Sequence, residues 1–147
     1  NEGFVHAYLL KLLGRREHTR LELIAKTKKK GMDEIDVIRI LDLLQDQGLQ
    51  SDERFAIEFL HSKAKAGFGP MRIRRDLSSK GIGRELINLA FRESEVDWLA
   101  NAKRVFKKKF PERSLELKEY ARRIRFLSYR GFEQEHIKKI AGELNTK

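Results

Sequence analysis

The feature that most constrains the fold is a glycine-centred pattern that recurs every 50 residues. Gly31, Gly81 and Gly131 each follow a basic residue and precede an apolar one. The segments read KGMDEIDVIRIL, KGIGRELINLAF and RGFEQEHIKKIA, with apolar residues six and nine positions after each glycine. Self-similarity at a fixed period is typical of chains built from repeated supersecondary units. The sequence therefore predicts three copies of one unit.

Each copy is expected to hold three helices, because apolar residues recur at helical spacing on both sides of the glycine. Thr19 and Glu22 form a capping box, Asp33 and Asp52 can each cap the helix that follows, and Pro70 suits a first helical turn. The glycine itself suits the left-handed position that ends a helix. The expected helices span residues 4–16, 20–29, 33–47, 53–66, 70–79, 83–93, 95–109, 114–129 and 133–144.

No window of the sequence alternates strong β-formers with polar residues, so we expect an all-α fold. The repeats are predicted to form three three-helix units, which span residues 1–50, 51–94 and 95–147. Cysteine is absent, which excludes disulfides and thiolate metal sites. No apolar run approaches the ~20 residues that span a bilayer. The opening stretch, NEGFVHAYLL, lacks the basic region of a signal peptide. We therefore expect a cytoplasmic protein with no membrane contact.

The positive charge is concentrated in the last third of the chain. The net charge is +10, of which residues 98–147 carry +8. A basic surface attracts anionic partners, with nucleic acid as the first candidate and an acidic protein surface as the second, although a solvated lysine-rich face has the same composition. The charge argument selects these candidate partner-binding or DNA-binding residues: Arg72, Arg74, Arg75, Lys80, Lys103, Lys107, Lys108, Lys118, Arg122, Arg125 and Arg130.

The helix expected at 114–129 has two distinct sides. One side carries an apolar stripe, made of Leu117, Tyr120, Ala121, Ile124 and Leu127, and the other mixes basic residues with Phe126 and Tyr129. Aromatic and basic groups on an outward face suit a polyanion or a protein partner. The alternative is that Phe126 packs against the neighbouring unit, and the sequence leaves both interpretations open.

The stretch GFGPMR, residues 67–72, also has two interpretations. It lacks the Gly-Lys-Ser/Thr of a phosphate-binding loop, and Arg72 stands where a dinucleotide fingerprint has its third glycine. Proline and glycine here mark the turn between two helices. The start of the helix at 70–79 can still attract a phosphate or carboxylate.

Residues that carry catalysis are missing from the sequence. The four histidines are far apart, no nucleophile elbow is present, and the acidic run DEID at 33–36 opens a helix, where acids favour the dipole. We therefore expect a binding protein that is not an enzyme, with no catalytic residue, no metal and no cofactor.

Four segments carry a family resemblance: REHTRLEL at 16–23, DERFAIEFLHSKAKAGFGPMRIRRDLSSKGI at 52–82, DWLANAKRVFKKKF at 97–110 and RFLSYRGF at 125–132. Together they resemble the RecX family of bacterial recombination regulators over nearly the whole chain. One small departure from the pattern is Thr27, which stands where the other two repeats have Leu77 and Leu127.

The resemblance implies a regulator of the RecA recombinase. Such proteins bind RecA and its filament on single-stranded DNA, lodge in the filament groove, and inhibit ATPase, strand-exchange and coprotease activities, which modulates DNA repair, recombination and the SOS response. The resemblance also implies three tandem three-helix repeats in an elongated, curved array without catalytic residues. We expect a monomer whose partner is the filament or single-stranded DNA, with weak direct binding to DNA as a further possibility. The main rival is a plain DNA-binding protein of the helix-turn-helix kind; a second rival is an enzyme with an unrecognised site.

Overall fold

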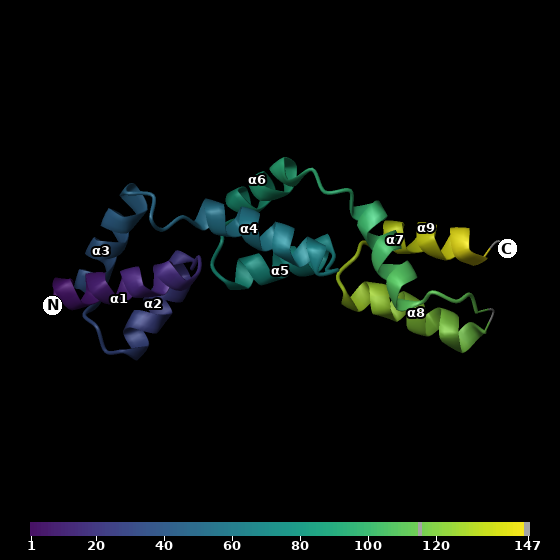
Figure 1. Ribbon diagram of the computed structural model, residues 1–147, viewed down its shortest axis with the longest axis horizontal. Coiled ribbons are helices and arrows are strands. Elements are labelled where there is room, and N and C mark those ends of the chain that lie inside the picture. The colour runs from purple at the N-terminus through teal and green to yellow at the C-terminus, as the bar shows by residue number, and fades with distance from the viewer. Residues whose placement is uncertain (115, 146–147) are drawn as a thin grey trace. The chain divides into compact units, whose positions relative to one another are not determined.

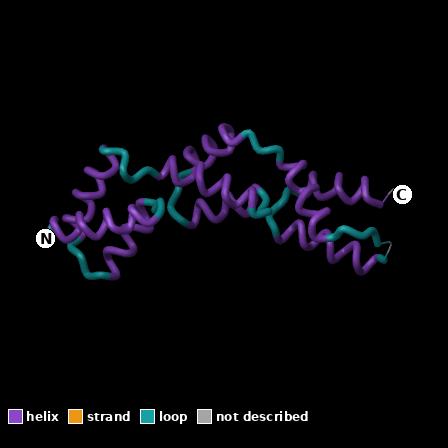
Figure 2. Tube along the Cα trace, viewed as in Figure 1, coloured by secondary structure: helices purple, strands orange, loops and turns teal. Residues whose placement is uncertain are grey.

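The computed structural model describes residues 1–114 and 116–145, and every regular element in these ranges is an α-helix (Figures 1 and 2). The all-α prediction is confirmed. The helices are α1 (Glu2–Arg15), α2 (Arg20–Lys29), α3 (Glu34–Asp46), α4 (Asp52–Lys65), α5 (Pro70–Ser79), α6 (Arg84–Ser94), α7 (Trp98–Lys109), α8 (Leu117–Tyr129) and α9 (Gln134–Asn145).

The expected helix bounds agree with these to within two residues, except at two starts. Helix α7 was expected from residue 95, but Glu95 has a φ of 55° and Asp97 caps the helix by accepting the N–H of Ala100. Helix α8 was expected from residue 114, but Glu116 is its first cap residue. The expected start of α8 also includes Leu115, which lies outside the described residues.

The three repeated glycines adopt the same left-handed turn, as predicted. Gly31, Gly81 and Gly131 have φ values of 74°, 90° and 93°. The residue after each glycine donates its N–H to the carbonyl oxygen five residues earlier, over 3.1, 3.1 and 3.2 Å respectively. This is the hydrogen-bond pattern of a Schellman C-cap, which satisfies a carbonyl at the end of the helix.

Most of the expected helix caps are also present. Thr19 and Glu22 form the capping box of α2, Asp33 caps α3, and α5 begins at Pro70. The prediction for Asp52 was wrong. Helix α4 begins at Asp52 itself, the Ser51 hydroxyl accepts the N–H of Arg54 at 3.0 Å, and the Asp52 carboxylate instead accepts the N–H of Arg20 at 2.9 Å.

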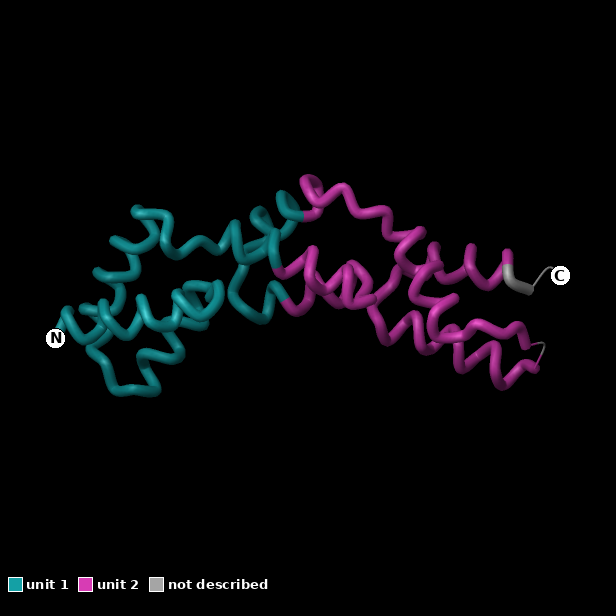
Figure 3. The backbone as a smooth tube through the Cα atoms, viewed as in Figure 1, with its two compact units in different colours: residues 1–58, 77–90 teal, residues 59–76, 91–147 magenta. Residues whose placement is uncertain are grey.

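The chain forms two compact units that do not coincide with the three repeats (Figure 3). Unit 1 comprises residues 1–58 and 77–90, and unit 2 comprises residues 59–76 and 91–147. Helices α4, α5 and α6 therefore each pass from one unit into the other. The repeat bounds at 1–50, 51–94 and 95–147 stay a prediction.

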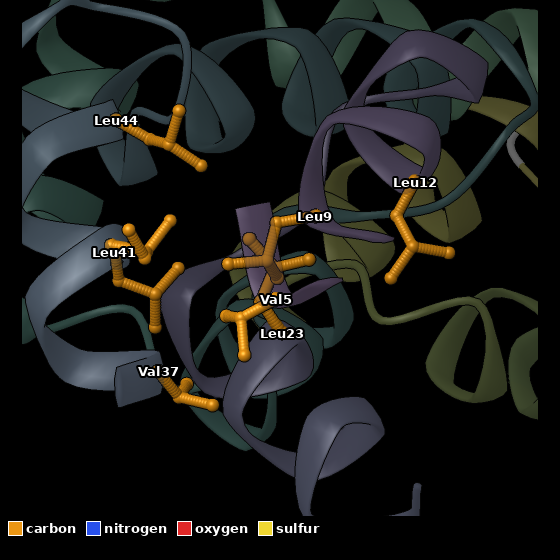
Figure 4. Close-up of a cluster of buried hydrophobic side chains, with 8 residues drawn as sticks. Val5, Leu9, Leu12, Leu23, Val37, Leu41 and Leu44 are labelled. Atoms are coloured by element: carbon orange, nitrogen blue, oxygen red, sulfur yellow. The ribbon is translucent and has the colours of Figure 1, made fainter. Parts of the chain in front are cut away.

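A hydrophobic core cluster of unit 1 lies between α1, α2 and α3 (Figure 4). It is built from aliphatic side chains that are at most 7% exposed: Val5, Leu9, Leu12, Leu23, Val37, Ile40, Leu41 and Leu44. Thr27 is buried beside them, and its hydroxyl donates to the carbonyl oxygens of Leu23 and Ile24, each at 2.9 Å. The polar group at this leucine-like position is therefore satisfied within its own helix.

The start of α2 packs against the turn between α5 and α6 in unit 1. The Thr19 hydroxyl donates to the carbonyl oxygen of Lys80 at 2.8 Å, and Thr19 is fully buried. A Cβ atom on Gly81 would lie 2.6 Å from the Leu21 Cβ, closer than real Cβ contacts. Only glycine permits this approach between the two segments.

The start of α5 packs in the same way against the turn between α8 and α9 in unit 2. The N–H of Gly69 donates to the Arg130 carbonyl at 2.6 Å, and that of Met71 donates to the Gly131 carbonyl at 2.9 Å. Proline 70 between them has no N–H. The N–H groups of Gly69 and Met71, which an anion at this helix start would need, are thus taken by backbone carbonyls. Of the two interpretations of GFGPMR, the structure favours the turn alone.

The core of unit 2 lies between α7, α8 and α9 and contains Ala102, Val105, Phe106, Phe110, Leu127, Phe132, Ile137 and Ile140. Phe126 packs against this core with its ring edge-on to Phe110, at 5.3 Å between ring centroids. The ring that Phe126 packs against thus belongs to the same predicted repeat, and not to the preceding one. The expected apolar stripe of α8 was wrong at its start, because Leu117 is 85% and Tyr120 37% exposed.

Candidate functional site

Ten of the eleven predicted cations lie in unit 2, and Lys80 lies in unit 1. Four of them already meet a carboxylate: Arg72, whose Nε lies 3.9 Å from Asp76, and Lys80, Lys103 and Arg122. The Lys80 ammonium lies 3.8 Å from Glu22, and the Lys103 ammonium lies 3.0 Å from Glu143. Partly exposed ion pairs of this kind contribute little to stability, but they reduce the charge that either lysine offers to a partner.

Arg122 is bound more firmly, by Glu119 one turn earlier in α8. Its Nε and a terminal nitrogen donate to the two carboxylate oxygens at 2.9 and 2.8 Å, and Arg123 Nε donates at 2.8 Å. The hydrogen bonds from Arg122 and Arg123 lower the pKa of Glu119 to about 2. The same pairing raises the pKa of Arg122. Arg122 is thus paired within its own helix, with a carboxylate that it shares with Arg123.

Aromatic rings position the arginines of α5. The guanidinium carbons of Arg72 and Arg130 lie 4.6 and 5.0 Å from the centroid of the Phe68 ring, and that of Arg74 lies 4.2 Å from the Phe91 centroid. Cation–π contacts of this kind hold each guanidinium group against the face of a ring. The loop GFGPMR therefore contributes a ring that gathers cations from two segments of unit 2.

Five of the predicted cations are exposed, and no described carboxylate lies within 4.0 Å of their charged groups: Arg75, Lys107, Lys108, Lys118 and Arg125. Their charge is not compensated by ion pairing within the described chain. They are the predicted residues best able to meet an external anion.

Five cations line one cavity of about 360 Å³ in unit 2, which we call the basic pocket: Lys65, Arg104, Lys108, Lys109 and Arg130. The rest of its wall consists of Ala66, Gly67, Val105 and Phe126. No acidic residue lines it, and none of its five cations belongs to an ion pair among the described residues. The pocket thus gathers five cations whose charge no described carboxylate compensates.

The charge argument selected Lys108 and Arg130 but missed three members of the pocket. Lys109 belongs to the same run of three lysines as Lys108, so the run was a usable signal. No sequence signal links Lys65 to Arg104, because they stand 39 positions apart in the sequence. Their proximity follows from folding alone. The role of every predicted residue in partner binding stays a prediction.

Neither a metal-binding cluster nor a membrane-spanning helix occurs among the described residues. No group of three or more histidine, aspartate or glutamate residues there is placed to hold a metal ion. None of the helices in those ranges is long and apolar enough to cross a membrane.

Comparison with known proteins assigns the family. Residues 51–90 match the second three-helix domain of RecX, and residues 95–140 match its third. Regulatory protein RecX of Pseudomonas entomophila strain L48 is 40% identical over 130 residues, covering 88% of this chain and 84% of that protein. Regulatory protein RecX of Ectopseudomonas mendocina strain ymp is 37% identical over 130 residues, covering 88% and 87%.

Two solved structures share the fold. The crystal structure of a regulatory protein RecX has a TM-score of 0.81 at 21% identity, covering 96% of this chain and 73% of that one. RecX from Lactobacillus salivarius has a TM-score of 0.79 at 20% identity, covering 99% and 97%. The matched family consists of regulatory proteins and not of enzymes. Taken with the domain matches and the close relatives, this shows that the chain belongs to the RecX family.

Proposed function

We propose that this protein binds the RecA recombinase and its filament on single-stranded DNA, and that it inhibits the ATPase, strand-exchange and coprotease activities of RecA. It thereby modulates DNA repair and recombination in the cytoplasm. The observation that carries the proposal is the 40% identity to Regulatory protein RecX over 130 residues. The uncompensated cations of unit 2 add support, because an anionic filament is their natural partner.

The proposed mechanism rests on many weak contacts. Tandem helical units offer an extended surface that can touch several subunits of a filament. Each further contact is intramolecular once the first is made, so local affinities multiply through effective concentration. A ligand that prefers one filament arrangement shifts the filament towards it, which hinders rearrangements linked to ATP hydrolysis. The elongated, curved array that this mechanism uses stays a prediction.

Among the predicted residues, the exposed cations without a described carboxylate partner are the best candidates for these contacts: Arg75, Lys107, Lys108, Lys118 and Arg125. Lys80, Lys103 and Arg122 are weaker candidates, because each is paired with a glutamate of this chain. The protein acts as a monomer and needs no cofactor in this proposal.

The test is the single-stranded-DNA-dependent ATPase of RecA, measured while this protein is titrated in at physiological salt. Binding of the protein to the same DNA without RecA is measured in parallel. Loss of ATPase at protein concentrations too low to coat the DNA supports a filament regulator. Loss only when the DNA itself is saturated means competition for DNA, and the plain DNA-binding protein would then be the better description.

A further inference from the structure

The basic pocket lies where the C-terminal ends of three helices meet. Its lining includes Lys65 at the end of α4, Lys109 at the end of α7, and Arg130, which follows the last residue of α8. A helix C-terminus carries a partial negative charge and unsatisfied carbonyls, which favour nearby lysine and arginine. The simplest explanation of the pocket is therefore that its cations serve the helix ends.

Two of the cations do serve the end of α4. A terminal nitrogen of Arg104 donates to the carbonyl oxygen of Ala64, and one of Arg130 donates to that of Ala66, both at 3.3 Å. Arg130 also lies over two rings, with its guanidinium carbon 5.0 Å from the Phe68 centroid and 5.1 Å from that of Phe126. These arginines are fixed parts of the wall.

The charge of the pocket exceeds what the helix ends require. Three helix C-termini together carry about −1.5 elementary charges, at roughly −0.5 each. Five cations line the cavity, and no acidic residue does. An excess of about +3.5 therefore remains if each helix end takes up half a charge. Lys65, Lys108 and Lys109 carry most of this excess, since they are exposed and belong to no ion pair that the structure describes. A need for helix capping does not explain them.

The composition of the wall identifies the class of ligand. Beside the lysines lie the Val105 side chain, the Phe126 side chain and the backbone of Gly67. A volume of about 360 Å³ is larger than a single anion needs and falls within the range of small-ligand pockets. A nucleotide combines a phosphate with a flat base in one residue, and its neighbours along the strand supply further charges. An acidic peptide matches the charge, but its aspartate and glutamate side chains carry no flat ring.

We propose that the basic pocket binds the phosphodiester backbone of single-stranded nucleic acid, with Lys65, Lys108 and Lys109 neutralising phosphates and Arg104 and Arg130 forming a rigid wall. This deepens the proposed function by naming the site at which this chain meets the DNA of the filament, and it rests on that function for its setting. The binding itself needs no recombinase.

The test measures binding of a short, fluorescein-labelled oligothymidylate by anisotropy, without RecA, over a series of salt concentrations. The variant combines Lys65→Gln, Lys108→Gln and Lys109→Gln. Losing three phosphate contacts reduces the slope of log K against log salt by about 2, and weakens binding at physiological salt by about 10- to 50-fold. Far-UV circular dichroism checks that the variant keeps its helices.

The matched control combines Lys28→Gln, Lys29→Gln and Lys30→Gln. These lysines are also exposed, also lie at the end of a helix, and their replacement removes the same net charge. The control is expected to bind within about twofold of the wild type, with an unchanged salt slope. Equal losses in both variants, or no loss in the pocket variant, would overturn the proposal.

A labelled oligoglutamate serves as the second probe. If the pocket variant loses oligoglutamate binding more than oligothymidylate binding, the pocket is a site for acidic protein segments and the proposal fails. Inhibition of the RecA ATPase is recorded separately for each variant. If the pocket binds DNA but the protein does not inhibit RecA, this inference stands and the proposed function falls. If the protein inhibits RecA but the pocket variant binds DNA as the wild type does, the proposed function stands and this inference falls.

Discussion

The backbone of Gly131 lies so close to Arg72 that a Cβ atom on Gly131 would stand 2.4 Å from the Arg72 Cβ and 2.6 Å from the Arg72 nitrogen. Gly31, at the equivalent turn of the first repeat, has the same left-handed backbone, but a Cβ there would have no neighbour within 4 Å. The two glycines share a backbone conformation and differ in what packs against them.

The variant Gly131→Ala is therefore expected to destabilise the protein far more than Gly31→Ala. A left-handed backbone with a side chain lowers the free energy of unfolding by about 1–2 kcal/mol in both variants. Overpacking against Arg72 adds about 1–3 kcal/mol in Gly131→Ala alone. Urea unfolding followed by circular dichroism measures both values. Equal losses would contradict the close packing of this turn on the start of α5.

Replacing Thr27 with leucine is expected to stabilise the protein. Thr27 is buried and borders a cavity of about 250 Å³, which has room for the added carbon atoms. Each buried methylene contributes ~0.8 kcal/mol, so Thr27→Leu raises the free energy of unfolding by about 1 kcal/mol. Losing the hydroxyl costs little, because the carbonyls that it contacts, those of Leu23 and Ile24, belong to the backbone of the same helix.

The converse variant, Leu127→Thr, serves as the comparison. Leu127 is fully buried in the core of unit 2, and its loss is expected to lower the free energy of unfolding by about 2–4 kcal/mol. Thermal unfolding of both variants checks the pair. A destabilised Thr27→Leu protein would mean that the cavity beside α2 does not accept the larger side chain.

Stability is expected to fall in acid partly because Glu119 is protonated. Its pKa in the folded protein is about 2, lowered from 4.5 by the hydrogen bonds from Arg122 and Arg123. A depressed carboxyl pKa contributes stability that is fully present above the unfolded value and is lost as the pH falls from about 4.5 to about 2. The wild type and Glu119→Gln should therefore differ at neutral pH and converge at the acid end of this range.

Carbon NMR of the Glu119 carboxyl group measures its titration directly. A midpoint near that of an ordinary glutamate would show that the two arginines do not hold the carboxylate in solution. The unfolding midpoints of Glu119→Gln and wild type would then stay equally far apart at every pH.

Charge reversal at three exposed cations of unit 2 is expected to abolish inhibition of the RecA ATPase. The variant combines Lys107→Glu, Lys108→Glu and Arg125→Glu, since like charges would then face an anionic filament. Arg122 is left in place because it pairs with Glu119. The control reverses Lys11, Lys28 and Lys29, which lie in unit 1 and are also exposed. If the first variant still inhibits RecA, or if both variants lose inhibition equally, the exposed cations of unit 2 do not contribute specifically to inhibition.

The sequence predicted the helices well because their signals are local. The left-handed glycines, the capping box at Thr19 and the proline at the start of α5 all act within a few residues of the bonds they specify. The start of α8 shows a limit of such local signals. Helix α8 has 13 residues, whereas α2 and α5 have 10, and its extra first turn places Leu117 in solvent.

The units and the basic pocket were beyond sequence reasoning because they depend on contacts between distant residues. Thr19 and Lys80 are 61 positions apart, and Arg130 and Ala66 are 64 apart. Asp52 shows the same effect at one residue, since its carboxylate binds the distant N–H of Arg20 and not its own helix. A charge count along the chain finds cations, but it does not find which of them line one cavity.

The interleaving of the two units has a consequence for synthesis on the ribosome. A nascent chain that has reached residue 76 carries the whole α1–α3 core but lacks residues 77–90, which complete unit 1. It also carries residues 59–76, whose unit partners, from residue 91 onward, have not yet been made. Residues 59–76 therefore lack the rest of their unit until the last third of the chain emerges, and the start of α5 depends on a turn made about 60 residues later.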